Sequence, residues 1–257
     1  MTSTAKYAYH PVAGTESVRY LNILLSILFA TAFLLFLVTS NVRWAFNTVE
    51  LYEFGFTRHD VASTTGLTNA QLSEAATQIR DYFNSPEELL DVRVSVDGGV
   101  VSLFAEREVL HMRDVKELVD KTYRVQEGSF LYMLVFATLG FLTMGSQFAT
   151  YLRNLINRST VATIIAILGA GVGATVGFAL LFRLFHELSF SNDLWQLDPR
   201  TSFLLQMFPQ GFWLEATMLV GVATVLEAGA LVGLIKLVRL RQAHNRRIAQ
   251  SKIPQYL

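Results

Sequence analysis

Four long apolar stretches alternate with polar segments along the chain. They cover residues 20–42, 129–152, 159–184 and 213–236. One helical crossing of a bilayer needs about 20 predominantly apolar residues. The first stretch is longer than the apolar region of a signal peptide, and no A-x-A cleavage pattern follows it, which favours a membrane anchor. The pattern therefore predicts an α-helical integral membrane protein with four transmembrane helices.

The charges between these stretches predict the orientation. The N-terminal tail (1–19), the short loop (153–158) and the C-terminal tail (237–257, with Lys236 before it) are basic. Segments 43–128 and 185–212 contain more acidic than basic residues. Basic loops stay in the cytoplasm. We therefore expect both termini inside and segments 43–128 and 185–212 outside the cytoplasmic membrane.

Segment 43–128 is patterned as a small extracytoplasmic α+β domain between the first two spans. Thr68 and Gln71 have the spacing of a capping box, and apolar residues of one helical face follow them. Residues 90–96 alternate apolar and polar, Asp97-Gly98-Gly99 is a hairpin turn, and 100–104 is the returning strand. Residues 106–119 then predict a helix.

Segment 185–212 is rich in aromatic residues and is expected at the membrane interface. Asp198-Pro199 predicts the start of a short amphipathic helix, since the pair places an N-cap before a proline at the first helical position. Trp195 and Phe208 are candidate contacts for a lipid-like substrate. A packed membrane-interface aromatic belt is the alternative interpretation of these rings.

Composition excludes several kinds of chemistry. Only 16% of the residues are charged, the net charge is zero, and there is no cysteine. A basic excess for nucleic-acid binding is missing, and disulfides, thiolate nucleophiles and Cys-ligated metals are excluded. The chain has no G-x-S-x-G, H-E-x-x-H or P-loop motif. We expect neither a cofactor nor a metal ion.

Two histidines, His111 and His186, lie one on each outer segment and are the candidate catalytic pair. Asp114 can share a helical face with His111 and orient its ring. Acidic residues near His186 can do the same for that ring, and Arg183 is a candidate cation for a developing oxyanion. These supporting candidates are Asp114, Arg183, Glu187, Asp193 and Asp198. The set suits acid–base chemistry on a lipid-like substrate without a protein nucleophile.

Several runs resemble a known family. They are NTVELYEFGF (47–56), STTGLTNAQL (63–72), EREVLHMRDVKEL (106–118) and the segment from Phe185 to Trp213, which begins FHELSF. In order and spacing they resemble the bacterial lipoprotein intramolecular transacylase (Lit) family, over residues 20–240. The resemblance implies a four-helix bundle with an extracytoplasmic globular part. It also implies that His111 and His186 match the two histidines that the family needs for activity.

The reaction implied by the resemblance is an acyl shift within one lipoprotein. The sn-2 acyl chain of a diacylglyceryl-modified N-terminal cysteine moves to the α-amino group of that cysteine, giving an N-acylated lyso-form. The expected partners are therefore a lipoprotein N-terminus and membrane lipid. The residues alone leave open which histidine is the base.

Two other functions remain open from the residues. One is a metal-dependent membrane hydrolase that uses both histidines and nearby carboxylates as ligands. The other is a non-enzymatic envelope scaffold. A transporter is disfavoured because the spans offer little besides Glu227 as an intramembrane ionisable group.

Overall fold

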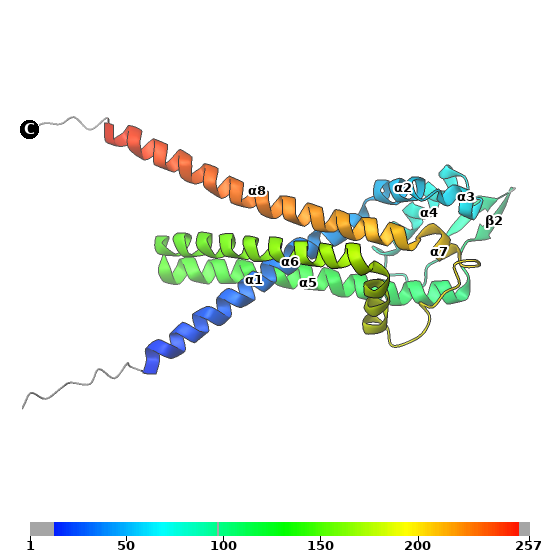
Figure 1. Cartoon of the computed structure of the whole chain (residues 1–257), viewed down its shortest axis with the longest axis horizontal. Helices are drawn as coiled ribbons and strands as arrows, with labels where there is room; N and C mark the ends of the chain where they lie inside the picture. The colour runs from blue at the N-terminus through cyan, green and yellow to red at the C-terminus, as the bar shows by residue number, and fades with distance from the viewer. Residues whose placement is uncertain (1–12, 97, 252–257) are drawn as a thin grey trace, which may run out of the picture.

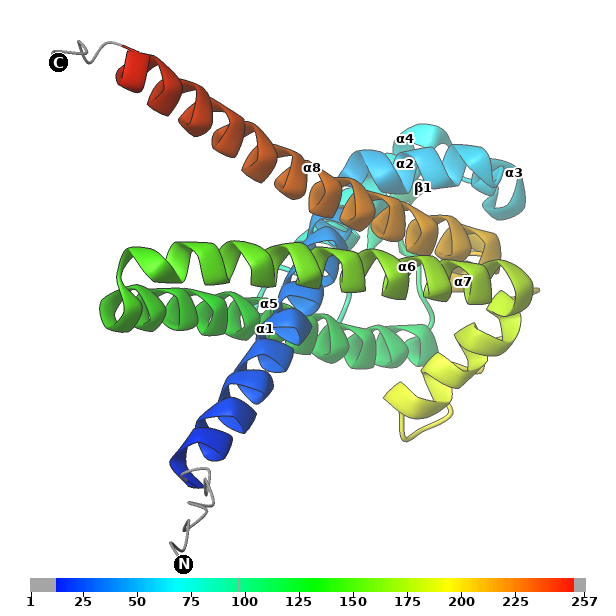
Figure 2. The same cartoon turned by 60° about the vertical axis from the view of Figure 1, so that its left-hand side comes forward.

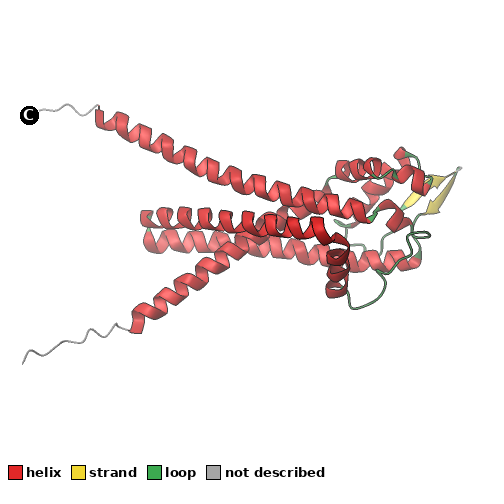
Figure 3. Ribbon diagram, in the orientation of Figure 1, coloured by secondary structure: helices red, strands yellow, loops and turns green. Residues whose placement is uncertain are grey.

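The computed structural model describes residues 13–96 and 98–251, with four long helices and a compact unit at one end (Figure 1). The elements in chain order are α1 (Ala13–Asn47), α2 (Val49–Arg58), α3 (Val61–Thr65), α4 (Asn69–Tyr82), β1 (Arg93–Val96), β2 (Gly99–Ser102), α5 (Glu106–Met144), α6 (Ser146–Ser189), α7 (Phe203–Met207) and α8 (Gln210–Ser251). The two strands form the sheet seen at one extreme of the molecule (Figure 3).

The helices α1, α5, α6 and α8 each contain a stretch long and apolar enough to cross a membrane. Their outward faces carry bare leucines, valines and phenylalanines, such as Leu142 and Val176, which are 77% and 86% exposed. A surface of this kind is stable against lipid and not against water. The protein is therefore a multi-pass membrane protein.

Helices α5 and α6 run side by side, and α1 crosses them (Figures 1 and 2). Phe29 and Phe33 of α1 pack with Leu155 of α6 at this crossing. Helix α8 lies along α6 near the compact unit and diverges from it towards the other end (Figures 1 and 2). Asn41 of α1 donates to Glu227 of α8 over 2.8 Å, which gives the intramembrane carboxylate a neutral partner.

The turn between the second and third long helices is at Gly145, so the expected loop at 153–158 is wrong. Residues 153–158 lie inside α6, and Gly145 has φ +56° and ψ −139°, a conformation that glycine adopts readily. The ring of Phe148 packs over Gly140, where a Cβ atom would clash with it, and lies 5.0 Å from the Phe141 ring. Arg153 and Arg158 mark a change in charge and do not interrupt the helical hydrogen bonds.

Helix α6 bends at Gly177, so the third span is not one straight helix over 159–184. Gly177 has φ −146° and ψ 40°, outside the helical region. Glycine is a common site of helix kinks. The last turns of α6, residues 178–189, turn away from the axis of the bundle (Figure 2). We call these residues the elbow.

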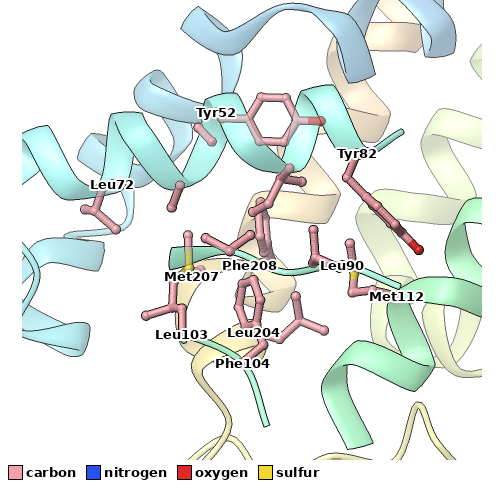
Figure 4. Close-up of a cluster of buried hydrophobic side chains, with 14 of the residues drawn as sticks. Tyr52, Leu72, Tyr82, Leu90, Leu103, Phe104, Met112, Leu204, Met207 and Phe208 are labelled. Atoms are coloured by element: carbon pink, nitrogen blue, oxygen red, sulfur yellow. The ribbon is translucent and has the colours of Figure 1, made fainter. Parts of the chain in front are cut away.

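Residues 49–123 and 203–213 form the head, which has its own apolar core (Figure 4). Thr68 and Gln71 form the expected capping box, and the predicted apolar face of α4 is buried. Strands β1 and β2 pair as an antiparallel hairpin, with Arg93 opposite Ser102. The predicted hairpin turn includes Asp97, which lies outside the described residues.

The short helix of the second outer segment begins later than expected. Helix α7 starts at Phe203, and Ser202 caps it by accepting a hydrogen bond from the Leu205 amide. Asp198 instead closes a turn, where it accepts from the amide of Arg200. The N-cap is therefore set by the residue whose hydroxyl reaches the free amides at the start of α7.

Within the head, Lys116 joins helix α5 to the loop after α4. Its ammonium donates to three backbone carbonyls, of Tyr82, Ser85 and Glu87, over 2.6–2.7 Å. It also lies 4.3 Å from the centre of the Tyr82 ring. A single cation thus satisfies carbonyls that the end of α4 and the following turn leave free.

Replacing Lys116 by methionine should destabilise the head by about 3 kcal/mol, because buried carbonyls lose charged donors. Thermally induced proteolysis of the purified protein in detergent measures the change. Lys121→Met is the matched control, since Lys121 is exposed and pairs only with Glu117 within the same helix. Equal midpoints for the two variants would contradict the assignment.

Candidate active site

The structure brings His111 and His186 together. His111 lies in the second turn of α5, and His186 lies in the elbow of α6. Their ring centroids are 6.2 Å apart. The two residues are only 7% and 8% exposed. Two histidines that are 75 positions apart in sequence thus form one buried pair.

Aromatic rings surround the pair. The ring centroid of Phe182 lies 4.3 Å from that of His186, and the ring centroid of Trp195 lies 5.2 Å from it. Phe190 packs beside both histidines, with its ring centroid 5.3 Å from that of His111 and 5.6 Å from that of His186. The site is therefore a histidine pair in an apolar aromatic shell, which suits a substrate with a lipid ester.

The hydrogen bonds differ between the two rings. Nδ1 of His186 lies 2.7 Å from the carbonyl oxygen of Phe182, which can only accept. Nδ1 therefore carries the hydrogen, and Nε2 of the neutral ring presents a lone pair. Nδ1 of His111 is buried and has no hydrogen-bond partner within residues 13–96 and 98–251.

Burial disfavours the charged form of both rings and lowers the pKa of each. His111 belongs to the polar first third of α5, which packs in the head, and His186 follows the third apolar stretch. Desolvation, reinforced by His186, lowers the pKa of His111 to about 4, although the Asp114 carboxylate opposes the shift. Desolvation also lowers the pKa of His186, against the raising effect of the Phe182 carbonyl.

The acidic candidates bind partners other than the two histidines. Asp114 accepts from Asn192 over 2.8 Å, and Asp193 pairs with Arg107. Arg183 and Glu187 form an ion pair with each other at 3.0 Å, one turn apart in the elbow. Asp198 pairs with Arg200 at 2.7 Å. Each of these carboxylates is thus seen bound to a nitrogen group other than the imidazoles.

The two aromatic candidates have different positions. The Trp195 ring lies beside His186, with the two ring planes tilted by 41°. Phe208 is buried in the core of the head, where its ring lies 5.4 Å from Phe56 and 5.1 Å from Phe212. An acyl chain cannot reach Phe208 unless that core opens.

Sequence reasoning missed several residues that shape the site. Glu108, one turn before His111, is 3% exposed and accepts from Ser202 Oγ and from the Leu204 amide. Its other oxygen accepts from the Ala105 amide at the start of α5. The available signal was its position on the same helical face as His111, three residues earlier.

A third histidine of the two outer segments, His59, was also overlooked and lies in a different environment. It contacts Glu215 of α8 at 3.4 Å, beside Arg58.

The part of the chain that the structure describes contains no group of three or more His, Asp or Glu residues placed to hold one metal ion. That finding gives no support to a metal-dependent hydrolase.

The chain matches a family model described as lipoprotein intramolecular transacylase Lit, over residues 27–213. No curated protein matches. Among solved structures it is similar to the membrane-integral Lit of Bacillus cereus, with 16% identity, a TM-score of 0.66, and coverage of 88% of this chain and 99% of that one. A variant of that protein with a histidine replaced by alanine matches at 15% identity and a TM-score of 0.69, covering 90% and 99%.

Acidification should test the neutral state of His111. The pKa of His111 is about 4 in the folded protein and 6.5 in the unfolded protein. Between pH 6.5 and pH 4 the unfolded protein therefore binds a proton that the folded protein does not. The free energy of unfolding falls as the pH falls through this range. Between pH 7 and pH 5 the wild type should lose about 2 kcal/mol more than His111→Gln. Thermal unfolding in detergent at both pH values measures this difference, and an equal loss in the two proteins would contradict it.

Proposed function

Because the chain belongs to the lipoprotein intramolecular transacylase (Lit) family, an acyltransferase family, we propose that it moves the sn-2 acyl chain of a diacylglyceryl-cysteine lipoprotein onto the α-amino group of the same cysteine. The ester C–O bond breaks and an amide C–N bond forms. The amine proton ends on the sn-2 oxygen of the glycerol. The product is an N-acylated lyso-form, and neither water nor another substrate is consumed.

The observation that carries this proposal is the histidine pair itself, buried together in an aromatic shell beside the membrane helices. The reaction needs no serine or cysteine nucleophile, because the substrate amine attacks. An α-amino group has a pKa of about 7.7–8.0, so an imidazole is a sufficient base. Ester and amine belong to one molecule, so holding it in a reactive conformation supplies much of the rate.

The hydrogen bonds of the rings favour a division of roles. His186 has its Nε2 lone pair free, since Nδ1 donates to Phe182, so His186 takes the proton from the attacking amine. His111, in its charged form, gives a proton to the departing glycerol oxygen. The proton that His186 took from the amine then returns to His111, so the net change is one proton moved from nitrogen to oxygen. Each role contributes roughly 10²–10⁴-fold to the rate.

The surrounding residues support this chemistry. Trp195 lines the path of the acyl chain, and Asp114 orients His111. Arg183, one turn before His186, offers a cation to the oxyanion of the tetrahedral intermediate, with Glu187 holding it. Asp193 links the segment that carries Trp195 to Arg107 of α5, and Asp198 holds the turn within that segment through its pair with Arg200.

Alanine at either histidine should abolish turnover, with a loss of at least 100-fold, while the protein remains folded in the membrane. Mass spectrometry of the N-terminal lipopeptide of a lipoprotein, with and without each variant, measures formation of the N-acyl lyso-form. His59→Ala is the matched control, because its ring pairs with Glu215 away from the site and should leave turnover intact. Near-normal product from a double His111/His186 alanine variant would refute the mechanism.

The membrane orientation is a second part of the proposal: both termini face the cytoplasm, and the head with the histidine pair faces outside. It is supported by the basic residues of α8 beyond Lys236 and by the acidic excess of segment 43–128. A fluorescent-protein fusion after Leu257 should fluoresce, and an alkaline phosphatase fusion at the same position should be inactive. Phosphatase activity at that position would refute this orientation.

A further inference from the structure

One segment of the chain packs against both histidines, beside the Phe182 and Phe185 rings of the elbow. Residues 190–202, which we call the strap, connect the elbow of α6 to α7. Phe190 and Trp195 of the strap lie against the two imidazoles. With both histidines less than 9% exposed, a diacylglyceryl group cannot touch them in this arrangement. The strap is the element whose movement would uncover them.

Three residues of α5 hold the strap, and they flank His111 on one helical face. Arg107 donates to the backbone carbonyl of Asp193. Glu108 accepts from Ser202 and from the Leu204 amide, at the start of α7. Asp114 accepts from Asn192 over 2.8 Å. Positions 107, 108 and 114 are each three or four residues from position 111, so each attachment neighbours the histidine on the helix surface.

These attachments differ in burial, and the exposed ones are easier to break than the buried ones. Glu108 and Ser202 are 3% and 5% exposed, and breaking a buried charged hydrogen bond is costly. The side chains of Arg107 and Asp193 are 47% and 74% exposed, and the hydrogen bond from Asn192 to Asp114 is also exposed. Exposed links of this kind contribute little. The Ser202 end is thus fixed, and the part around Asn192 is the part that can leave.

The carboxylate of Asp114 has a second possible partner. His111 precedes it by three positions, and the buried Nδ1 of His111 has no partner among the described residues while Asp114 binds Asn192. An imidazole that must deliver a proton needs an acidic partner to become charged. In the closed arrangement desolvation opposes that charge.

We propose that Asn192 and His111 alternate as partners of Asp114, so that Asp114 is a positioning residue controlled by the strap. With the strap closed, Asp114 holds Asn192 and His111 stays neutral. When the substrate displaces the strap, Asn192 leaves and Asp114 accepts a hydrogen bond from His111 Nδ1. His111 can therefore become charged and act as the acid of the reaction only when the substrate is present. This inference rests on the proposed function.

The other charged groups around the pair are already engaged. They are Arg183 and Glu187, which pair with each other, Asp193 with Arg107, Arg113 with Glu88 and Asp114, and Glu108 with the start of α7. Glu108 is held by three donors in a buried position. Asp114 is therefore the carboxylate beside His111 whose main partner lies on the movable segment.

Asn192→Ala, made in the wild type and in Asp114→Ala, tests the alternation, because alanine at 114 removes the oxygens that accept from Asn192. Losing a hydrogen bond that holds the strap closed should raise kcat/KM about fivefold in the wild type. It should also move the His111 pKa, seen as the acid break in the pH profile of kcat/KM, to higher pH, because that profile reports the free enzyme. In the Asp114→Ala background the same replacement should change neither quantity.

Asn84→Ala is the matched control, because Asn84 makes comparable side-chain hydrogen bonds to Asn47 and the Arg80 carbonyl elsewhere in the head. It should leave the pH profile unchanged. An equal effect of Asn192→Ala in both backgrounds, or an unmoved acid break in the wild type, would overturn the alternation. Full activity of His111→Ala would instead refute the proposed function.

A cross-link tests the movement of the strap directly. The chain has no cysteine, so Arg107→Cys/Asp193→Cys can be joined specifically by a short bis-methanethiosulfonate linker and released by dithiothreitol. The joined enzyme should lose at least tenfold in turnover and recover it on reduction. Glu117→Cys/Lys121→Cys, one turn apart within α5, is the control and should be insensitive. Undiminished turnover of the joined strap would overturn the proposal.

Discussion

The bend of α6 at Gly177 is the constraint on which the histidine pair depends. Helices α5 and α6 run side by side from their turn at Gly145, and His111 lies 34 residues before that turn while His186 lies 41 residues after it. In two straight helices the two rings would be offset by seven residues, about 10 Å along the axis. The elbow turns away from the axis and brings His186 back beside His111. A non-glycine residue at 177 would favour the straight helix and work against the pairing.

Burial decides what the paired imidazoles can do. Phe182, Phe190 and Trp195 exclude water, which keeps the rings neutral and makes any charge that develops on them sensitive to a nearby carboxylate. The same aromatic rings suit the lipid part of the proposed substrate. Catalysis in such a site needs a route for the substrate, and the route is closed here by the strap. Protection of the site and access to it thus depend on the same short segment.

The head has a second role as the anchor of that segment. Its core includes Leu204 and Met207 of α7, so the far end of the strap is fixed to a stable unit. Glu108 joins α5 to α7 from within this unit, one turn from His111. Met112, the residue next to His111, packs into the same core, which fixes the rotation of α5 and directs His111 towards the elbow.

The sequence by itself determined the four apolar helices, the capped helix α4, the hairpin and the two histidines, because each follows from local composition, period or spacing. Membership of the Lit family was likewise visible in short runs of residues. Only the tertiary structure decided the partners of Asp114, Arg183 and Asp193, the burial of Phe208, and the positions of the turn at Gly145 and the bend at Gly177. Partners are chosen by packing between segments far apart in the chain, and neither charge nor periodicity records which of several nearby groups a side chain reaches. A glycine likewise permits a turn without requiring one, so its use is settled by the contacts that the turn makes possible.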